Sequence, residues 1–415
     1  MADGCEGVRA DRRDLIAMLL DYDTLMIDVQ SDDAEDTEWL AEFLCPFFSR
    51  RDSAAGQAAA CRVRLMGDPP VFHRWKQRLG SAATRPSRAF LLDTGPVEFA
   101  TFSEGGGLVA HDDFFDVFFR WSPGPGPRAV DIVDDYRGDA VAGSRPRQAR
   151  MPLMRAVREW AMHHSLRRGR IFLHAAAVAR NGKAVLFAGP KKAGKTSLLI
   201  AALGTHADTG CLAHDRVMVV GGGSGLTVRG MPSIVSVRPG SLEFLPGVEP
   251  RLLASACGHT SRSLEATTPV TFADGRYALS PPQFCHVVDA RTVAEAGLAA
   301  IVFPRVRSEE ATLAVRPLST QEAAERLTEV VFGIAAAGEP SAMFDVAEPD
   351  TYPDLESLLA SAVRLANDVP CLEVGLGRSA YRPDVVGGLL ERLFSDRTRP
   401  GEHYPEETGR GCSRE

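Results

Sequence analysis

One stretch of eight residues has the spacing of a phosphate-binding loop: a glycine, four free positions, a second glycine, a lysine and then Ser or Thr. Because glycine adopts backbone angles closed to residues with a Cβ, such a loop can turn its N–H groups towards phosphate oxygens. The expected nucleotide-binding residues are Gly189, Pro190, Lys191, Lys192, Ala193, Gly194, Lys195, Thr196 and Ser197. The stretch predicts a site for ATP or another nucleoside triphosphate.

The side chains at the end of this loop have separate expected roles. Lys195 would place its ammonium group against the outer phosphates, and Thr196 would offer its hydroxyl to Mg²⁺. A helix expected over residues 196–203 would point the positive end of its dipole at the same phosphates. Lys191 and Lys192 have two interpretations: they neutralise charge on a transferred phosphoryl group, or they are solvated at the loop tip.

The flanks of the loop support this interpretation. Residues 184–188 form a short apolar run, which is typical of a buried parallel strand. Strand, glycine loop and apolar helix is the order in which phosphate-binding loops occur. The alternative is a glycine turn that only caps a core helix.

Composition limits the class of protein. A chain of 415 residues is long enough for two or three domains, and its 45% hydrophobic and 24% charged residues are typical of a soluble globular protein. Its net charge of −7 argues against binding to nucleic acid or to an anionic membrane. The charged start of the chain does not look like a signal peptide, so we expect a cytoplasmic protein. The eight cysteines contain no Cys-x-x-Cys pair, which favours reduced thiols, several of them in the core.

The pattern of short runs predicts two domains and a tail. Residues 1–149 would form a strand-rich α+β domain, which we expect to serve substrate recognition or oligomer contacts. Residues 150–395 would form the nucleotide-binding domain, and residues 396–415 a disordered tail. Near the start, Leu15, Ile16, Leu19 and Leu20 have helical spacing and predict a helix, with a strand at residues 25–27.

The second domain is expected to be an α/β domain with α+β character, a mixed sheet flanked by helices. Its expected strands cover residues 171–179, 183–188, 210–220, 226–229, 234–237, 298–303 and 371–374. Its expected helices cover residues 151–166, 196–203, 320–332, 352–367 and 384–394. Asn181 and Gly182 predict a two-residue hairpin turn, and Ser319 predicts a helix cap. Residues 265–287 are mixed and strand-like.

The region around the loop resembles the HPr kinase/phosphorylase family. The resemblance rests on residues 172–178 (Phe-Leu-His-Ala-Ala-Ala-Val), the hairpin, the phosphate loop and residues 212–217 (Leu-Ala-His-Asp-Arg-Val). Residues 277–281, 298–305 and 369–373 are also similar to HPr-kinase-like proteins of peptide-modifying gene clusters. The strong part covers residues 171–220, the weaker part runs to about residue 394, and residues before about 150 are not covered.

The resemblance implies an ATP-dependent phosphotransferase that uses Mg²⁺ and acts on a hydroxyl, usually of serine. The acceptor would be a small molecule, a peptide or a protein. The hexamers of the family imply a homo-oligomer by analogy. Three functions follow from the resemblance: a kinase, a nucleotide-dependent ATPase or switch without a phosphoacceptor, and a phosphatase or phosphorylase.

The resemblance also implies roles for particular residues. His174 corresponds to the family histidine near the phosphates, and Asp215 to the second acid of the following strand. The first acid of the family, thought to take the proton from the attacking hydroxyl, is His214 in this chain. Imidazole titrates near neutrality and can act as a general base. Otherwise the site has lost its base and only binds or slowly hydrolyses nucleotide.

The expected catalytic residues are therefore His214, Asp215, His174 and Lys195, and the expected metal ligands are Thr196 and Asp215. Carboxylate oxygen suits Mg²⁺, but Asp215 also has an alternative in a salt bridge to Arg216. His174 has an alternative as a satisfied core histidine. Two further residues that follow expected strands, Arg238 and Arg305, would reach the mouth of the site.

Overall fold

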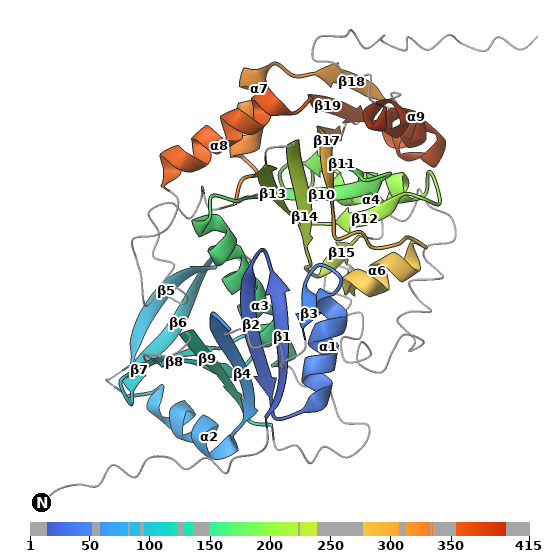
Figure 1. Cartoon of the computed structure of the whole chain (residues 1–415). Coiled ribbons are helices and arrows are strands. Elements are labelled where there is room, and N and C mark those ends of the chain that lie inside the picture. Colours follow the sequence, from blue (N-terminus) through green and yellow to red (C-terminus); the bar gives the residue numbers. More distant parts are fainter. Residues whose placement is uncertain are drawn as a thin grey trace, which may run out of the picture. The chain divides into compact units, whose positions relative to one another are not determined.

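The computed structural model describes residues 15–51, 59–81, 84–91, 95–122, 128–136, 149–222, 225–238, 277–306, 313–332, 334 and 354–395 (Figure 1). Among the described residues, those within Met1–Glu42, Phe48–Ala89 and Pro96–Arg158 form one compact unit, here called the N-terminal unit. Those within Phe43–Phe47, Phe90–Gly95 and Glu159–Glu415 form the other, here called the phosphate-loop unit. The tail predicted over residues 396–415 lies outside the described residues.

The N-terminal unit is built on a sheet whose described strands run in the order β3-β1-β2-β4-β9-β8-β7-β6-β5. These strands are β1 (Ile16–Tyr22), β2 (Leu25–Ser31), β3 (Ser49–Arg51), β4 (Cys61–Gly67), β5 (Arg85–Leu91), β6 (Gly95–Glu104), β7 (Gly107–Asp112), β8 (Val117–Ser122) and β9 (Arg128–Asp134). The pairings of β4 with β2 and with β9 are parallel. Its helices are most of α1 (Ala34–Leu44) and all of α2 (Pro69–Arg78), and α3 (Arg150–Arg167) is divided between the two units after Arg158. Aromatic residues of α2, Phe72 and Trp75, are buried against Phe118 of the sheet.

The helix predicted near the start is wrong, because residues 16–22 form strand β1. β1 pairs antiparallel with β2 through a tight turn at Asp23 and Thr24, and with β3 on its other edge. Met18, Leu19 and Leu20 are all buried although they are consecutive. A strand that buries both faces shows an unbroken apolar run, and such a run can match helical spacing by accident.

The phosphate-loop unit contains a second mixed sheet in the order β11-β10-β13-β14-β17-β19-β18, with β12 paired to β10 and β11 also paired to β17. Its strands are β10 (Ile171–Arg180), β11 (Lys183–Ala188), β12 (Gly210–Ala213), β13 (Arg216–Gly222), β14 (Gly225–Met231), β17 (Glu295–Val306), β18 (Ala314–Pro317) and β19 (Cys371–Leu376). A small separate sheet pairs β15 (Val235–Val237) with β16 (Tyr277–Leu279). The pairings of β17 with β11 and with β19 are parallel.

Helices cover both faces of this second sheet. They are α4 (Lys195–Leu203), α6 (Pro281–Val287), α7 (Thr320–Thr328), α8 (Leu355–Asp368), α9 (Pro383–Phe394) and the 3-10 helix η4 (Arg378–Tyr381). Alternate residues of β11 face opposite ways: Val185 and Phe187 pack with α4, α6 and α9, whereas Leu186 packs with α7 and α8. Figure 1 shows α7 and α8 grouped apart from α4 and α9. The predicted mixed α/β fold with flanking helices is confirmed.

Several local predictions are also confirmed. Asn181 and Gly182 have positive φ angles of 51° and 74° and join β10 to β11 as a two-residue hairpin.

The strand-like expectation for residues 265–287 is only half right. Residues 265–276 lie outside the described part, and β16 is a strand, but α6 is a helix that begins with a capping box between Ser280 and Gln283.

A membrane-spanning helix, judged by length and hydrophobicity, is absent from the residues that the structure describes.

The cap predicted at Ser319 gives a test of local stability. Its hydroxyl accepts from the Glu322 N–H, and the Glu322 carboxylate accepts from the Ser319 N–H at 2.9 Å. Ser319→Ala leaves the first turn of α7 without this acceptor, and we expect the opening free energy of its amides to fall by about 1 kcal/mol. Hydrogen exchange of the α7 amides measures this change. Ser319→Asp retains an acceptor and is the matched control; equal exchange in wild type and Ser319→Ala would contradict the cap.

Candidate functional site

The predicted phosphate loop lies at the carboxyl edge of the parallel strands of the second sheet. β11 ends at Ala188, and the loop runs from there to the start of α4 at Lys195. β17 and β19 run parallel to β11, so their carboxyl ends meet the same edge. Ligands of α/β sheets bind at this edge, beyond the carboxyl ends of parallel strands.

The backbone of the loop has the form that anion binding needs. Lys192 and Gly194 have positive φ angles of 73° and 97°, and the Ala193 N–H donates to the Pro190 carbonyl at 3.2 Å. Gly194 is the N-cap of α4 and brings no side-chain hydrogen bond to it. The first N–H groups of a helix have no intrahelical acceptor, and they are a ready site for phosphate.

The second glycine of the loop is also required by close packing. A Cβ on Gly194 would lie 2.8 Å from the Tyr381 hydroxyl oxygen and 3.2 Å from Cγ2 of Val306. Tyr381 comes from η4 and Val306 from the end of β17, so both are remote from the loop in sequence. No pattern in the sequence marks either residue. Their contact with the loop follows from the parallel arrangement of the sheet.

Lys195 is folded back onto its own loop. Its Nζ donates to the carbonyl oxygens of Gly189 at 2.7 Å and of Pro190 at 2.9 Å, and only 7% of the residue is exposed. Burial lowers the pKa of Lys195 to about 8, although the negative charge of Asp215 opposes this shift. The ammonium group is therefore held at the loop by two carbonyl oxygens. A bound phosphate would take their place as its partner.

Asp215 and His174 form the polar centre of the site. Asp215 lies between β12 and β13, and its carbonyl accepts from the Ala175 N–H at 3.0 Å. The His174 Nε2 lies 3.0 Å from Asp215 Oδ1, and the Arg216 Nη2 lies 3.6 Å from Asp215 Oδ2. The side chains of His174 and Asp215 are 30% and 34% exposed, so both are partly open to solvent.

The charge state of Asp215 follows from these contacts. Burial by itself would raise the pKa of Asp215, but the hydrogen bond from His174 and the positive charge of Arg216 outweigh it. They hold the pKa of Asp215 well below its usual range, so the carboxylate is ionised. Since an ionised carboxylate only accepts, the contact with Asp215 requires a proton on the Nε2 of His174.

His214 has different surroundings. Its Nε2 is 3.1 Å from the Ser233 hydroxyl oxygen, and its ring lies 6.5 Å from the ring of Phe284. Only 7% of the residue is exposed. The structure therefore brings Lys195, Asp215 and His174 into one group. His214 lies close enough for its charge to lower the pKa of Asp215, and its imidazole contacts Ser233. Its role as the base stays a prediction.

The remaining predicted residues lie around the loop or further from it. Pro190, Lys191 and Lys192 are exposed, which fits the solvated interpretation of the two lysines. Thr196 and Ser197 are half-buried in the first turn of α4. Two arginines are exposed at the ends of strands: Arg238 directly follows β15 and Arg305 lies near the end of β17.

The residues present fit a nucleotide with Mg²⁺. Among the described residues, no group of three or more His, Cys, Asp or Glu side chains is arranged to hold a metal ion. Mg²⁺ is commonly bound by one or two protein ligands, waters and the phosphates of its nucleotide, so such a cluster is not needed. Thr196 supplies a hydroxyl, and the ionised Asp215 supplies a carboxylate. Because His174 and Arg216 already contact its two oxygens, we favour contact of Asp215 with the ion through water.

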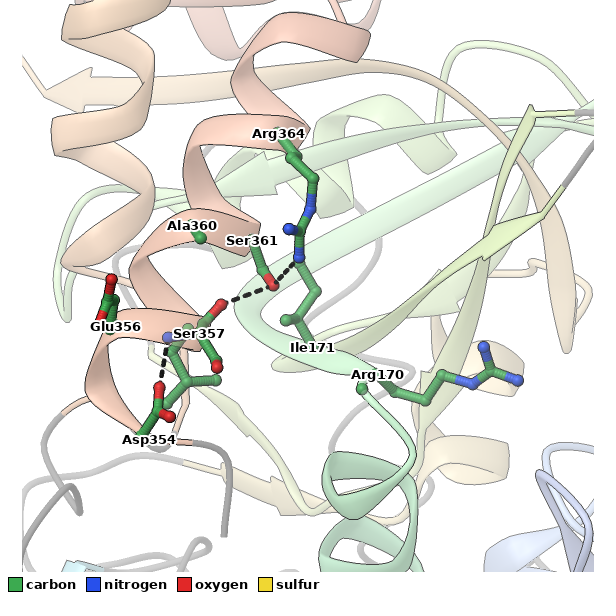
Figure 2. A pocket seen from close by; sticks show the side chains of 10 residues that line it. Arg170, Ile171, Asp354, Glu356, Ser357, Ala360, Ser361 and Arg364 are labelled. Carbon is green, nitrogen blue, oxygen red and sulfur yellow. Dashed lines mark hydrogen bonds between the residues drawn. The ribbon is translucent and has the colours of Figure 1, made fainter.

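A pocket elsewhere in the phosphate-loop unit is lined by other residues. A pocket of about 430 Å³ lies between α8 and the start of β10 (Figure 2). Arg364 donates to the Ser361 hydroxyl at 2.7 Å, Ser361 donates to the Ser357 carbonyl, and Asp354 accepts from the Ser357 N–H. These polar groups bond to one another along the helix, and none of the predicted site residues lines the pocket.

Comparison of the chain with protein-family models and with curated proteins finds no match. Among solved structures, one match is the Hpr(Ser) kinase/phosphatase from Coxiella burnetii, with 9% sequence identity and a TM-score of 0.26. The match covers 53% of this chain and 94% of the other. A similarity of this strength gives no evidence on function.

The geometry of Gly194 leads to a first test of nucleotide binding. Gly194→Ala places a Cβ against the Tyr381 hydroxyl on a backbone that L-residues rarely adopt. We expect it to weaken ATP binding by at least about tenfold, since the loop must open, at a cost of about 1–3 kcal/mol. Titration with a fluorescent ATP analogue measures the affinity. Gly204→Ala, at the other end of α4, has φ −78° and ordinary contacts, and it should leave binding unchanged. If Gly194→Ala binds ATP as tightly as wild type, the assignment of the phosphate loop is contradicted.

The lowered pKa of Lys195 predicts a pH dependence. Below about pH 8 the free protein carries the ammonium group that phosphates need; above it the lysine is neutral. ATP affinity should therefore fall by about tenfold between roughly pH 7 and pH 9, because binding must then take up a proton. Calorimetric titration at several pH values checks this. Lys191→Ala, a change of an exposed lysine, should retain the same profile, and a flat profile in wild type would contradict the role of Lys195.

Proposed function

We propose that the protein is an ATP-dependent phosphotransferase that uses Mg²⁺ to phosphorylate a serine-type hydroxyl of a small molecule, peptide or protein. The observation that carries the proposal is the placement of a His174–Asp215 pair beside the loop that holds Lys195. Lys195 and Asp215 are close enough for the charge of one to affect the pKa of the other. The Gly189 N–H at the loop start also points to the His174 carbonyl, at 3.4 Å.

Phosphoryl transfer requires mainly positioning and charge stabilisation. The loop N–H groups, the first turn of α4 and Lys195 hold the triphosphate, with the terminal phosphate directed towards the half-exposed pair. Thr196 and Asp215 would hold Mg²⁺, which would supply neutralisation of charge on the phosphate oxygens. Release of the Lys195 ammonium from the Gly189 and Pro190 carbonyls frees it to follow the phosphates.

His174 is the proposed proton acceptor. Its Nε2 proton is fixed by Asp215, and its Nδ1 lone pair accepts the proton of the acceptor hydroxyl as the hydroxyl oxygen attacks the terminal phosphorus. The bond from that phosphorus to the bridging oxygen breaks, and ADP leaves. The carboxylate of Asp215 stabilises the imidazolium that forms. His214, which the sequence favoured for this role, is less exposed and already bonded to Ser233.

The test compares the two histidines. Labelled ATP is supplied with a panel of serine peptides and free serine, and transfer to the acceptor is measured. We expect His174→Gln and Asp215→Asn to lower transfer by about a hundredfold or more, with ATP binding nearly unchanged. His214→Gln should have a much smaller effect, and Lys195→Ala should abolish nucleotide binding.

The other outcomes identify the alternatives. Loss of transfer in His214→Gln but not in His174→Gln would make His214 the base. Hydrolysis of ATP at the same rate with and without every acceptor would favour a nucleotide-dependent switch. Release of phosphate from a phosphoserine peptide without net transfer would favour a phosphatase or phosphorylase.

A further inference from the structure

Two cysteines lie together in the core of the phosphate-loop unit. Cys211 belongs to β12 and Cys285 to α6, and both are in the apolar cluster that packs α4 and α9 against the sheet. They are 3% and 5% exposed. Their positions in sequence are far apart, so only the fold brings them into one cluster.

A short segment links the two thiols. The Cys211 N–H donates to the Arg291 carbonyl at 2.8 Å, and the Val293 N–H donates to the Cys211 carbonyl at 2.9 Å. Thr292, between them, pairs with Cys211 as a β-bridge, and its hydroxyl donates to the Cys285 Sγ at 3.4 Å. Cys211 and Cys285 therefore flank the same residue, and their thiols are near enough for each to shift the pKa of the other.

This contact makes the two thiols unequal. The hydrogen bond from Cys211 and that from Thr292 lower the pKa of Cys285 despite its burial. The same contact and burial raise the pKa of Cys211 well above its usual value. A thiolate is the reactive form of cysteine, and the Cys285 sulfur accepts the hydrogen bond from Thr292 that stabilises its negative charge, so Cys285 is assigned as the sulfur that reacts first. By contrast, burial alone raises the pKa of Cys371 to about 12.

We propose that Cys211 and Cys285 are a redox modification site that forms a reversible intramolecular disulfide when a hydroperoxide reaches the core. The Cys285 thiolate attacks one oxygen of hydrogen peroxide, the O–O bond breaks, and a sulfenic acid and hydroxide form. The hydroxide takes up the proton that the Cys285 thiol had lost and becomes water. The Cys211 sulfur then attacks the Cys285 sulfur, the S–O bond breaks, and the second hydroxide leaves with the Cys211 proton as water. Two thiols lose two electrons, and the peroxide is reduced to two waters.

The disulfide would act on the candidate site. Cys211 lies three residues before His214, and Phe284, next to Cys285, packs against the His214 ring. An S–S bond of about 2.05 Å draws β12 and α6 closer than two thiols in contact. The segment that places His214 and Asp215 must move with β12. This consequence, weaker nucleotide binding in the oxidised protein, rests on the proposed function; the disulfide itself does not.

Peptide mapping tests the bond. The full chain is treated with hydrogen peroxide, its remaining thiols are alkylated, and the digest is analysed by mass spectrometry with and without dithiothreitol. We expect a linked pair of peptides that contain Cys211 and Cys285, lost on reduction, and the loss of two titratable thiols. Cys211→Ala and Cys285→Ala should each prevent the link, and Cys371→Ala, a change of another buried thiol, should leave it intact.

The contrary results are distinct. The proposal is overturned if Cys285 stays reduced, becomes only a sulfinic or sulfonic acid, or links to another cysteine. A melting curve of each variant shows that a lost link is not a lost fold.

Nucleotide titration of the same samples separates the two proposals. Oxidised wild type should bind ATP about tenfold more weakly than reduced wild type, a difference of about 1.4 kcal/mol, and dithiothreitol should restore binding. Oxidised Cys285→Ala should show no change. If the disulfide forms and affinity is unchanged, control of the site is overturned; if the reduced protein binds no ATP, the proposed function fails while the mapped disulfide stands.

Discussion

The absence of a side chain at Gly194 is the constraint on which the phosphate loop depends. At this position the chain turns from the loop into α4 with a φ of 97°, and the space that a Cβ would fill is taken by Tyr381 and Val306. Three segments, from β11, β17 and η4, converge on this one residue because the strands before them share an edge of the sheet. Tyr381 and Val306 support the loop on the face that packs against the protein. We infer that its N–H groups are directed to the other face of the loop, where an anion can bind.

The charges of the site hold one another in place. Lys195 is buried, and the cost of burying its ammonium is reduced by two carbonyl oxygens and by Asp215. Asp215 in turn is kept ionised by His174 and Arg216. Arg216 is positioned by the face of the Phe332 ring, 5.1 Å from its guanidinium carbon. Such a set of mutually dependent charges is typical of a reactive site.

The thiol pair shows how the same core that supports the site also carries a reactive group. The apolar cluster around Cys211 and Cys285 contains the helix that starts the loop, so the packing that aims α4 at the ligand includes both sulfur atoms. Close packing transmits a change in the length of one contact to its neighbours. β12 (Gly210–Ala213) contains Cys211 and ends two residues before Asp215, so it connects that core directly to the site.

The sequence by itself determined the parts that depend on near neighbours. The Asn181-Gly182 turn and the Ser319 cap are set by backbone angles and hydrogen bonds within a few residues, and both are present as predicted. In the loop, Gly194 has a positive φ, whereas Gly189 does not. Only the tertiary structure decided which residues meet across the sheet. The register of β10 against β13 placed His174 beside Asp215, and the ladder beyond β13 and β14 gave His214 a partner in Ser233. The same dependence made residues 16–22 a strand, because pairing on both edges and burial on both faces outweighed their helical spacing. Register is a property of two distant segments together, so the pattern of either segment alone does not contain it.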